Sequence, residues 1–297
     1  MINWRVSAGF LLAAYVWLAP IVPAHAGSML LLGTGTLTTG CSQATTYLAR
    51  TSGGNEAGNS VPITALICGL VTDGVITGNL STTGCGTPLD ALYILAQQNS
   101  ADSWLNLCGT SFTIGQFGAN TFTALMGWSG FNISGGSLDT RFNATTATSP
   151  HYTQNSASYG FWSVATAVET RAQMGSSNSG ATGESNIFDN YTDGNFYARV
   201  NNGTTTGVAS PGTKGLYVAE RPSSTNVIPY WDGIAQATQT SASSSPFNGD
   251  FFIGSVPGNV GSAQQFAEAH IGAALGSTLN LALYNRLRTY MTAIGVP

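Results

Sequence analysis

The last fifth of the chain changes from one hydrophobic period to another. Residues Phe266–Leu275 alternate apolar residues with small or polar ones, which is the pattern of a half-buried strand. Ser277 is a suitable helix N-cap, and apolar residues then recur at helical spacing. These residues are Leu279, Leu283, Leu287 and Tyr290. A strand followed by an amphipathic helix predicts a β domain that ends in one short helix.

Short aromatic and β-branched runs, separated by turn residues, fill the chain from Trp104 onward. The turn signals Asp193-Gly194 and Asn202-Gly203, for example, flank the run from Phe196 to Val200. We predict strands over 111–114, 122–124, 127–131, 137–142, 159–165, 185–191, 195–201, 215–221, 226–231, 250–254 and 266–275. This spacing predicts a mainly β fold in which two antiparallel sheets form a sandwich.

Residues 44–108 have a helical pattern instead. The segment Ala44–Arg50 is followed by apolar residues at helical spacing within Ile63–Val71 and again within Leu89–Ala96. Pro62 and Pro88 each stand where a helix could begin. We therefore expect three short helices that form a small module before a sandwich over residues 109–297.

The composition is typical of an exported protein that is rich in turns. Hydrophobic residues make up 43% of the chain and charged residues only 7%, with 37 glycines, so hydroxyls and amides supply most of the surface polarity. Nine Lys and Arg residues and a net charge of -4 give no basic stripe. Nucleic acid is therefore not expected as a partner.

Residues 1–26 have the pattern of a secretory signal peptide. Arg5 precedes the apolar run Val6–Leu18, and Ala24-His25-Ala26 is a small-x-small cleavage site. We expect cleavage near Ala26, export, and no membrane span in the mature chain. Two alternatives remain open, namely an uncleaved anchor and a start of translation at Met29.

Residues 27–43 are expected to be an arm or linker. They contain an apolar patch at 29–32 followed by a run of Gly and Thr. The patch has no partner of its own in the sequence and could insert into a neighbouring molecule. A homo-oligomer formed through the N-terminal module is the corresponding hypothesis.

The four cysteines all lie in the first third of the mature chain. Export favours disulfides, and four cysteines allow three connectivities. We prefer the pairs Cys68 with Cys85 and Cys41 with Cys108, which would close an insertion and join its two ends. No CxxC spacing occurs, so a zinc site is not indicated.

Several of the predicted strands carry a resemblance to a known family. Their sequences resemble, in order, successive strands of laminin G-like domains of the concanavalin A-like jelly-roll class. The matching runs are 135–142, 159–165, 195–201, 228–233, 250–254 and 266–275, within about residues 110 to 291. The resemblance implies a lectin-like jelly roll.

A second resemblance concerns the helical module as well. The run Tyr47-Leu-Ala-Arg50 and the run Leu89-Asp-Ala-Leu-Tyr-Ile94, placed before such a sandwich, are similar to uncharacterised bacterial proteins associated with phage or prophage. This likeness implies a biological context and no chemistry.

Motifs for catalysis are weak. No Gly-x-Ser-x-Gly elbow occurs, and His151 and His270 lack a surrounding motif. The closest acids are Glu184, Asp189 and Asp193, which do not form the Glu-x-Asp-x-Glu strand of some concanavalin A-like hydrolases. We expect no catalytic residues, and a glycoside hydrolase of the same fold remains an alternative.

The laminin G resemblance also implies a calcium site. Domains of that family often hold Ca²⁺ at a loop rim through acidic and carbonyl oxygens. The matching positions here are Asp189, Asn190 and Asp193. Calcium needs six to eight oxygen ligands, so main-chain groups would have to contribute.

Sugar binding needs aromatic faces together with amides and hydroxyls. In the strand from Asn195, period two puts Tyr197 and Arg199 on one face and the apolar residues on the other. Packing inside the sandwich is the alternative role for the aromatic residues. Our candidate ligand residues are Tyr191, Asn195, Tyr197, Arg199 and Tyr230.

The leading hypothesis is a secreted, non-catalytic lectin-like protein that binds a glycan or a cell-surface ligand. A structural or self-assembling protein of a phage-derived particle or surface assembly is the second hypothesis.

Overall fold

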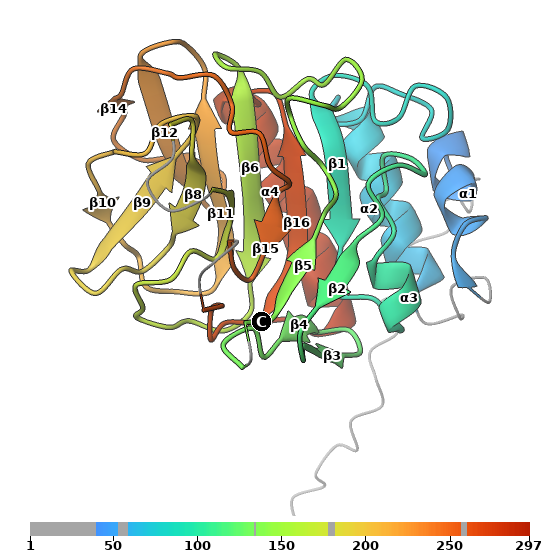
Figure 1. Cartoon of the computed structure of the whole chain (residues 1–297). Coiled ribbons are helices and arrows are strands. Elements are labelled where there is room, and N and C mark those ends of the chain that lie inside the picture. The colour runs from blue at the N-terminus through green and yellow to red at the C-terminus, as the bar shows by residue number, and fades with distance from the viewer. Residues whose placement is uncertain (1–39, 53–58, 134, 178–181, 257–259) are drawn as a thin grey trace, which may run out of the picture. The chain divides into compact units, whose positions relative to one another are not determined.

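The strands of the protein form two antiparallel sheets. The computed structural model describes residues 40–52, 59–133, 135–177, 182–256 and 260–297. Within them, the larger sheet has the order β13-β12-β11-β6-β16-β4-β3, with β1 paired to β16 and β14 paired to β12. The smaller sheet has the order β10-β9-β8-β7-β15-β5-β2. Figure 1 shows β9, β8 and β5 of the smaller sheet in front of the larger one. A mainly β fold of two antiparallel sheets is thus confirmed.

The larger sheet contains β1 (Leu89–Ile94), β3 (Thr121–Thr123), β4 (Gly127–Ser129), β6 (Ala157–Ser163), β11 (Gly215–Arg221), β12 (Asn226–Trp231), β13 (Ile234–Ala235), β14 (Gln239–Thr240) and β16 (Phe266–Gly272). The smaller sheet contains β2 (Gly115–Phe117), β5 (Ser137–Asp139), β7 (Met174–Ser176), β8 (Ser185–Phe188), β9 (Asn195–Arg199), β10 (Val208–Ala209) and β15 (Phe252–Ile253).

The space between the two sheets is filled by apolar side chains that follow the period of two. On β9, Phe196 and Ala198 are buried while Asn195, Tyr197 and Arg199 are half-buried. This confirms the predicted alternation of that strand. Aromatic rings dominate the layer, and Phe161, Phe266 and Tyr217 are among those in contact.

A second core lies between the larger sheet and the helices. The helices are α1 (Ser42–Leu48), α2 (Ser60–Thr72), α3 (Ser100–Ser103) and α4 (Gly276–Ile294), and α4 lies behind β6 and β16 in Figure 1. Leu283, Leu287 and Tyr290 of α4 are buried here together with residues of α2. The predicted amphipathic face of the last helix is therefore confirmed. Ser277 is not its N-cap, because it lies inside α4.

The third expected helix, at Leu89–Ala96, is wrong. These residues form β1, which pairs with β16 from Leu89–Gly272 to Ile94–Glu268. The strand is buried on both faces, with Leu92 facing the helices and Tyr93 facing the smaller sheet. A strand covered on both faces has a nearly continuous apolar sequence, which periodicity does not separate from a buried helix.

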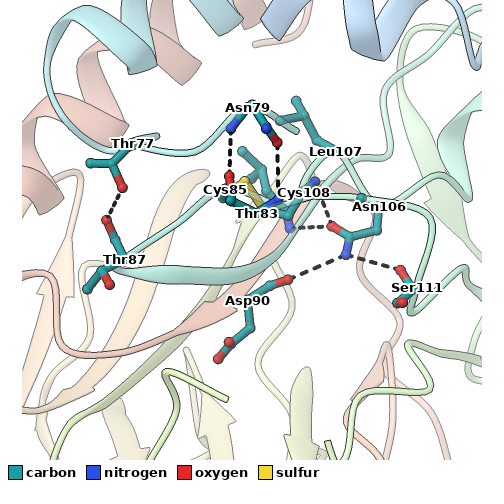
Figure 2. The surroundings of a disulfide bond; sticks show 12 residues. Thr77, Asn79, Thr83, Cys85, Thr87, Asp90, Asn106, Leu107, Cys108 and Ser111 are labelled. Atoms are coloured by element: carbon teal, nitrogen blue, oxygen red, sulfur yellow. Dashed lines mark hydrogen bonds between the residues drawn. A yellow bond between two sulfur atoms is a disulfide. The ribbon is translucent and has the colours of Figure 1, made fainter. Parts of the chain in front are cut away.

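The preferred disulfide pairing is also wrong. Cys41 is bonded to Cys68, which joins α1 to α2, and Cys85 is bonded to Cys108. Figure 2 shows Asn106 beside the second bond, where its Oδ1 accepts from the amide of Cys108 and its Nδ2 donates to the carbonyls of Asp90 and Ser111. Cys85 and Cys108 lie before and after β1, so the second bond closes the segment that contains this strand.

The residues 40–297 make up one compact unit. A boundary at residue 109 would separate β1 from its partner β16 in the same sheet. The predicted signal segment 1–26, the cleavage site at Ala26 and most of the arm 27–43 lie outside the described residues. Two disulfides fit an exported protein. In the described part of the chain, no helix has the length and apolar character that a membrane span requires.

Candidate functional site

A cavity of about 420 Å³ lies on the face of the smaller sheet that points away from the core. Its floor comes from β8 and β9, and its walls come from the segments after β6 and after β15. This volume lies within the roughly 300–1,000 Å³ of typical small-molecule sites. The lining residues are Thr170, Arg171, Ala172, Ser177, Glu184, Asn186, Phe188, Arg199, Val256 and Val260.

The floor is built by two neighbouring strands in register. Asn186 of β8 is opposite Arg199 of β9, and Phe188 is opposite Tyr197. Because side chains alternate along a strand, Glu184, Asn186 and Phe188 share the outer face. The guanidinium carbon of Arg199 lies 5.1 Å from the centre of the Phe188 ring, a cation–π contact.

Polar groups of the floor have unused hydrogen-bonding capacity. Asn186 is only 4% exposed, and its Nδ2 donates to Glu184 Oε2 at 3.3 Å. Within the described residues, Asn186 Oδ1 and Arg199 Nε have no hydrogen-bond partner although both atoms are buried. A Cβ at position 175 would lie 2.5 Å from Asn186 Oδ1, so Gly175 leaves the room that this amide occupies.

Two wall segments are held together by a buried polar network. Glu169 accepts hydrogen bonds from the hydroxyl of Ser262 and the amide of Ala263, and Arg171 Nη1 donates to the carbonyl of Gly261. Gln173 donates to Glu169 and so connects this network to β8. The walls of the cavity therefore have a defined position relative to the sheet.

Asp189 belongs to the same buried network. Its Oδ1 accepts from Gln264 Nε2 at 2.7 Å, and its backbone amide donates to Gln173 Oε1. Burial raises the pKa of Asp189 to about 7, an effect opposed by the hydrogen bond from Gln264 and reinforced by the charge of Glu169. Asp189 is consequently a structural acid inside the protein.

The predicted calcium residues do not share a pocket. Asp189 is buried, whereas Asp193 is exposed in a turn, where the hydroxyl of Tyr197 donates to it at 2.6 Å and lowers the pKa of its carboxyl. Among the described side chains, no group of three or more His, Cys, Asp or Glu is placed to hold a metal ion. A Ca²⁺ site at Asp189, Asn190 and Asp193 stays a prediction.

The candidate ligand residues separate into four groups. Arg199 lines the cavity. Tyr191 meets both Phe188 and Tyr197 edge to face, at 5.6 and 5.5 Å between ring centres, so these rings extend the aromatic surface beyond the cavity. Asn195 lies farther along β9, where its amide donates to Asp193.

Tyr230 lies apart from the cavity and from the other candidate residues. It lies on β12 of the other sheet, is 2% exposed and packs in the core beneath the helices. Tyr230 and Trp231 are neighbours on β12, and Trp231 is the half-buried one of the two. The cavity residues Glu184, Asn186 and Phe188 were not in the predicted site. The spacing of two within the strand predicted over 185–191 does place Asn186 and Phe188 on one face, and Glu184 lies one residue before that strand.

The two histidines are not arranged for catalysis at this cavity. His270 is fully buried between the larger sheet and the helices, and its Nδ1 lies 2.9 Å from Glu268 Oε1. His151 lies in a loop, where its amide donates to Asp90. Neither residue lines the cavity.

No family model and no curated protein matches this sequence. Among solved structures, domain 4 of AbnA, an extracellular GH43 arabinanase from Geobacillus stearothermophilus in complex with arabinotriose, is 13% identical. The alignment covers 66% of this chain and 98% of that one, with a TM-score of 0.41. The receptor-binding domain of botulinum neurotoxin D is 9% identical over 67% of this chain and 52% of that one, with a TM-score of 0.47.

A mutant of Trypanosoma rangeli sialidase that displays trans-sialidase activity reaches a TM-score of 0.50 at 11% identity. The alignment covers 79% of this chain and 40% of the sialidase, so the chain spans well under half of that enzyme's length. At this identity the likeness concerns the fold alone. It fits the two-sheet architecture and assigns no site.

Proposed function

We propose that this protein is a secreted, non-catalytic recognition protein with a lectin-like sandwich, and that it binds a glycan in the cavity over β8 and β9. In this proposal the sandwich is a jelly roll of the laminin G-like or concanavalin A-like class. The signal segment is removed near Ala26, and the arm that follows is free to mediate self-association.

The observation that carries the proposal is the lining of the cavity. Buried Asn186 Oδ1 and Arg199 Nε have no partner among the described residues, so both have capacity for a ligand's polar groups. The aromatic ring of Phe188 contacts the Arg199 guanidinium, and the ring of Tyr191 packs against Phe188. A sugar matches such a lining, because it presents both hydroxyl groups and an apolar ring face.

The same lining argues against hydrolysis at this cavity. Glycoside hydrolysis ordinarily needs two carboxyl groups, roughly 5 to 9.5 Å apart, on either side of the bond that is cleaved. Among the described residues that line the cavity, Glu184 is the one carboxylate. Binding without turnover is the function that this set of residues supports.

A glycan array with the secreted protein tests the proposal, together with a variant that fills the cavity mouth. Val260 is 51% exposed and lines the cavity, so Val260→Trp would obstruct the site without disturbing the core. We expect the wild type to bind a defined set of glycans and Val260→Trp to lose at least about tenfold in affinity.

Val61→Trp is the matched control. Val61 is 72% exposed on α2, on the helical side of the larger sheet, so this variant should bind as the wild type does. Array binding that survives in Val260→Trp would remove the cavity from the proposal. Concentration-dependent assembly without binding to any glycan would instead favour a structural protein of a phage-derived particle.

A further inference from the structure

Within the described residues, neither arginine of the cavity forms an ion pair. In the described part of the chain, the ion pairs within 4 Å are Glu268 with His270 and Asp73 with Arg286. Arg171 donates to one backbone carbonyl, and the Arg199 guanidinium contacts the Phe188 ring. Two guanidinium groups therefore line one cavity, and neither lies within 4 Å of a carboxylate of the described residues.

The single acid of the lining does not cancel this positive character. Glu184 is 4% exposed and accepts from Asn186 Nδ2, so its carboxylate is directed into the protein's own hydrogen bonding. The described lining holds two arginines and one glutamate, a formal charge of +1, whereas the whole chain carries -4. The cavity is thus a positive site on an acidic protein.

A guanidinium group binds planar anions well. It presents its N–H donors in a fixed fork that matches a carboxylate or sulfate, and these charge-assisted hydrogen bonds are about twice as strong as neutral ones. Next to this fork, Asn186 Oδ1 has no partner among the described residues, and as an amide oxygen it can only accept a hydrogen bond. The cavity is therefore complementary to a ligand that has an anionic group and, beside it, a hydroxyl donor.

We propose that the ligand is an acidic glycan, whose carboxylate or sulfate group binds Arg199 and Arg171 while a neighbouring ring hydroxyl donates to Asn186. This inference rests on the proposed function and adds the substrate class. Recognition is by the guanidinium groups themselves and requires no metal ion.

The test compares sugars that differ only in charge. Glycans that end in galacturonate, 6-sulfogalactose or galactose, and a second pair that ends in glucuronate or glucose, would be immobilised and titrated with the full-length secreted protein. We expect an acidic member to bind at least about tenfold more tightly than its neutral partner. Comparison of the galacturonate glycan with the 6-sulfogalactose glycan shows whether the site prefers a carboxylate or a sulfate.

Arg199→Gln removes the charge and keeps a polar side chain of similar reach. We expect this variant to bind the acidic and the neutral member of a pair about equally, with its thermal unfolding unchanged. Arg288→Gln is the control, because Arg288 is an exposed cation on α4, outside the cavity. Its preference for the acidic sugar should remain, and EDTA should leave wild-type binding unaltered.

The possible outcomes test different claims. Neutral glycans that bind as tightly as acidic ones, or a preference for acid that survives in Arg199→Gln, would overturn the inference and leave the lectin proposal standing. Loss of binding in EDTA would overturn direct recognition by the arginines. An array on which no glycan binds would overturn the proposed function, and the inference with it.

Discussion

The carboxylate of Glu220 on β11 accepts a hydrogen bond from the backbone amide of Gly276, at 3.1 Å, where α4 begins. It also accepts from the amide of Leu275 at 2.9 Å and from Asn280 Nδ2 at 2.7 Å. An anion at a helix N-terminus satisfies free N–H groups and suits the helix dipole. A residue of the sheet, 56 positions earlier in the chain, therefore caps the last helix.

Replacing this buried cap should destabilise the protein strongly. Glu220→Ala leaves the amides of Leu275 and Gly276 and the side chain of Asn280 without their acceptor, and each unsatisfied donor costs about 1–3 kcal/mol. We expect a loss of at least about 3 kcal/mol in the free energy of unfolding, measured by urea denaturation. The exposed Asp193→Ala should leave it nearly unchanged. Equal stability of Glu220→Ala and the wild type would refute the capping role.

The buried acid Asp189 predicts a dependence of stability on pH. Its pKa is raised to about 7, so between about pH 4 and pH 7 the folded protein keeps a proton that the unfolded chain has lost. The contribution of this group to stability is full below about pH 4 and is lost as pH rises through about 7.

Asp189→Asn imitates the protonated side chain at every pH. We expect this variant and the wild type to have similar free energies of unfolding at pH 4. At pH 8 the variant should be more stable by an amount on the order of a few kcal/mol. Differential scanning calorimetry would measure both. For Asp193→Asn the trend should be the reverse and small, because the pKa of exposed Asp193 is lowered by the hydrogen bond from Tyr197. A difference between Asp189→Asn and wild type that does not grow with pH would contradict this assignment.

The disulfide pairing is directly testable. Peptide mapping without reduction should recover Cys41 joined to Cys68 and Cys85 joined to Cys108. Removing the first bond with Cys41→Ala and Cys68→Ala should cost about 3–4 kcal/mol by the chain-entropy relation for a separation of 27 residues. Recovery of Cys41 with Cys108 would show a different path of the chain around β1.

Truncation of two tyrosines should reduce stability to very different degrees. Tyr230→Ala removes a ring that is 2% exposed in the core beneath α4, and we expect a loss of about 3–5 kcal/mol in stability. Tyr197→Ala removes a half-buried ring next to Phe188, with a change in stability below about 1 kcal/mol. Chemical denaturation of both variants would show whether the larger loss is at Tyr230, and a larger loss at Tyr197 would reverse our placement of the two rings.

Part of the candidate site could be read from local pattern. The alternation of β9 puts Tyr197 and Arg199 outside, and Arg199 does line the cavity. Nothing in that pattern says that Arg171 and Val260 reach the same cavity, since they belong to segments about 30 and 60 residues away along the chain. Those residues meet only because β7 lies between β8 and β15.

The sequence by itself determined the buried face of most segments, with Tyr230 on β12 as an exception, because that choice depends on a period of two or 3.6 within a few neighbours. It therefore predicted most strands of the two sheets and the apolar face of α4. Only the tertiary structure decided that Leu89–Ile94 is a strand, which cysteines pair, and that Glu220 caps α4. Each of these depends on contacts between distant segments, and a buried apolar run or a lone carboxylate carries no local mark of its partner.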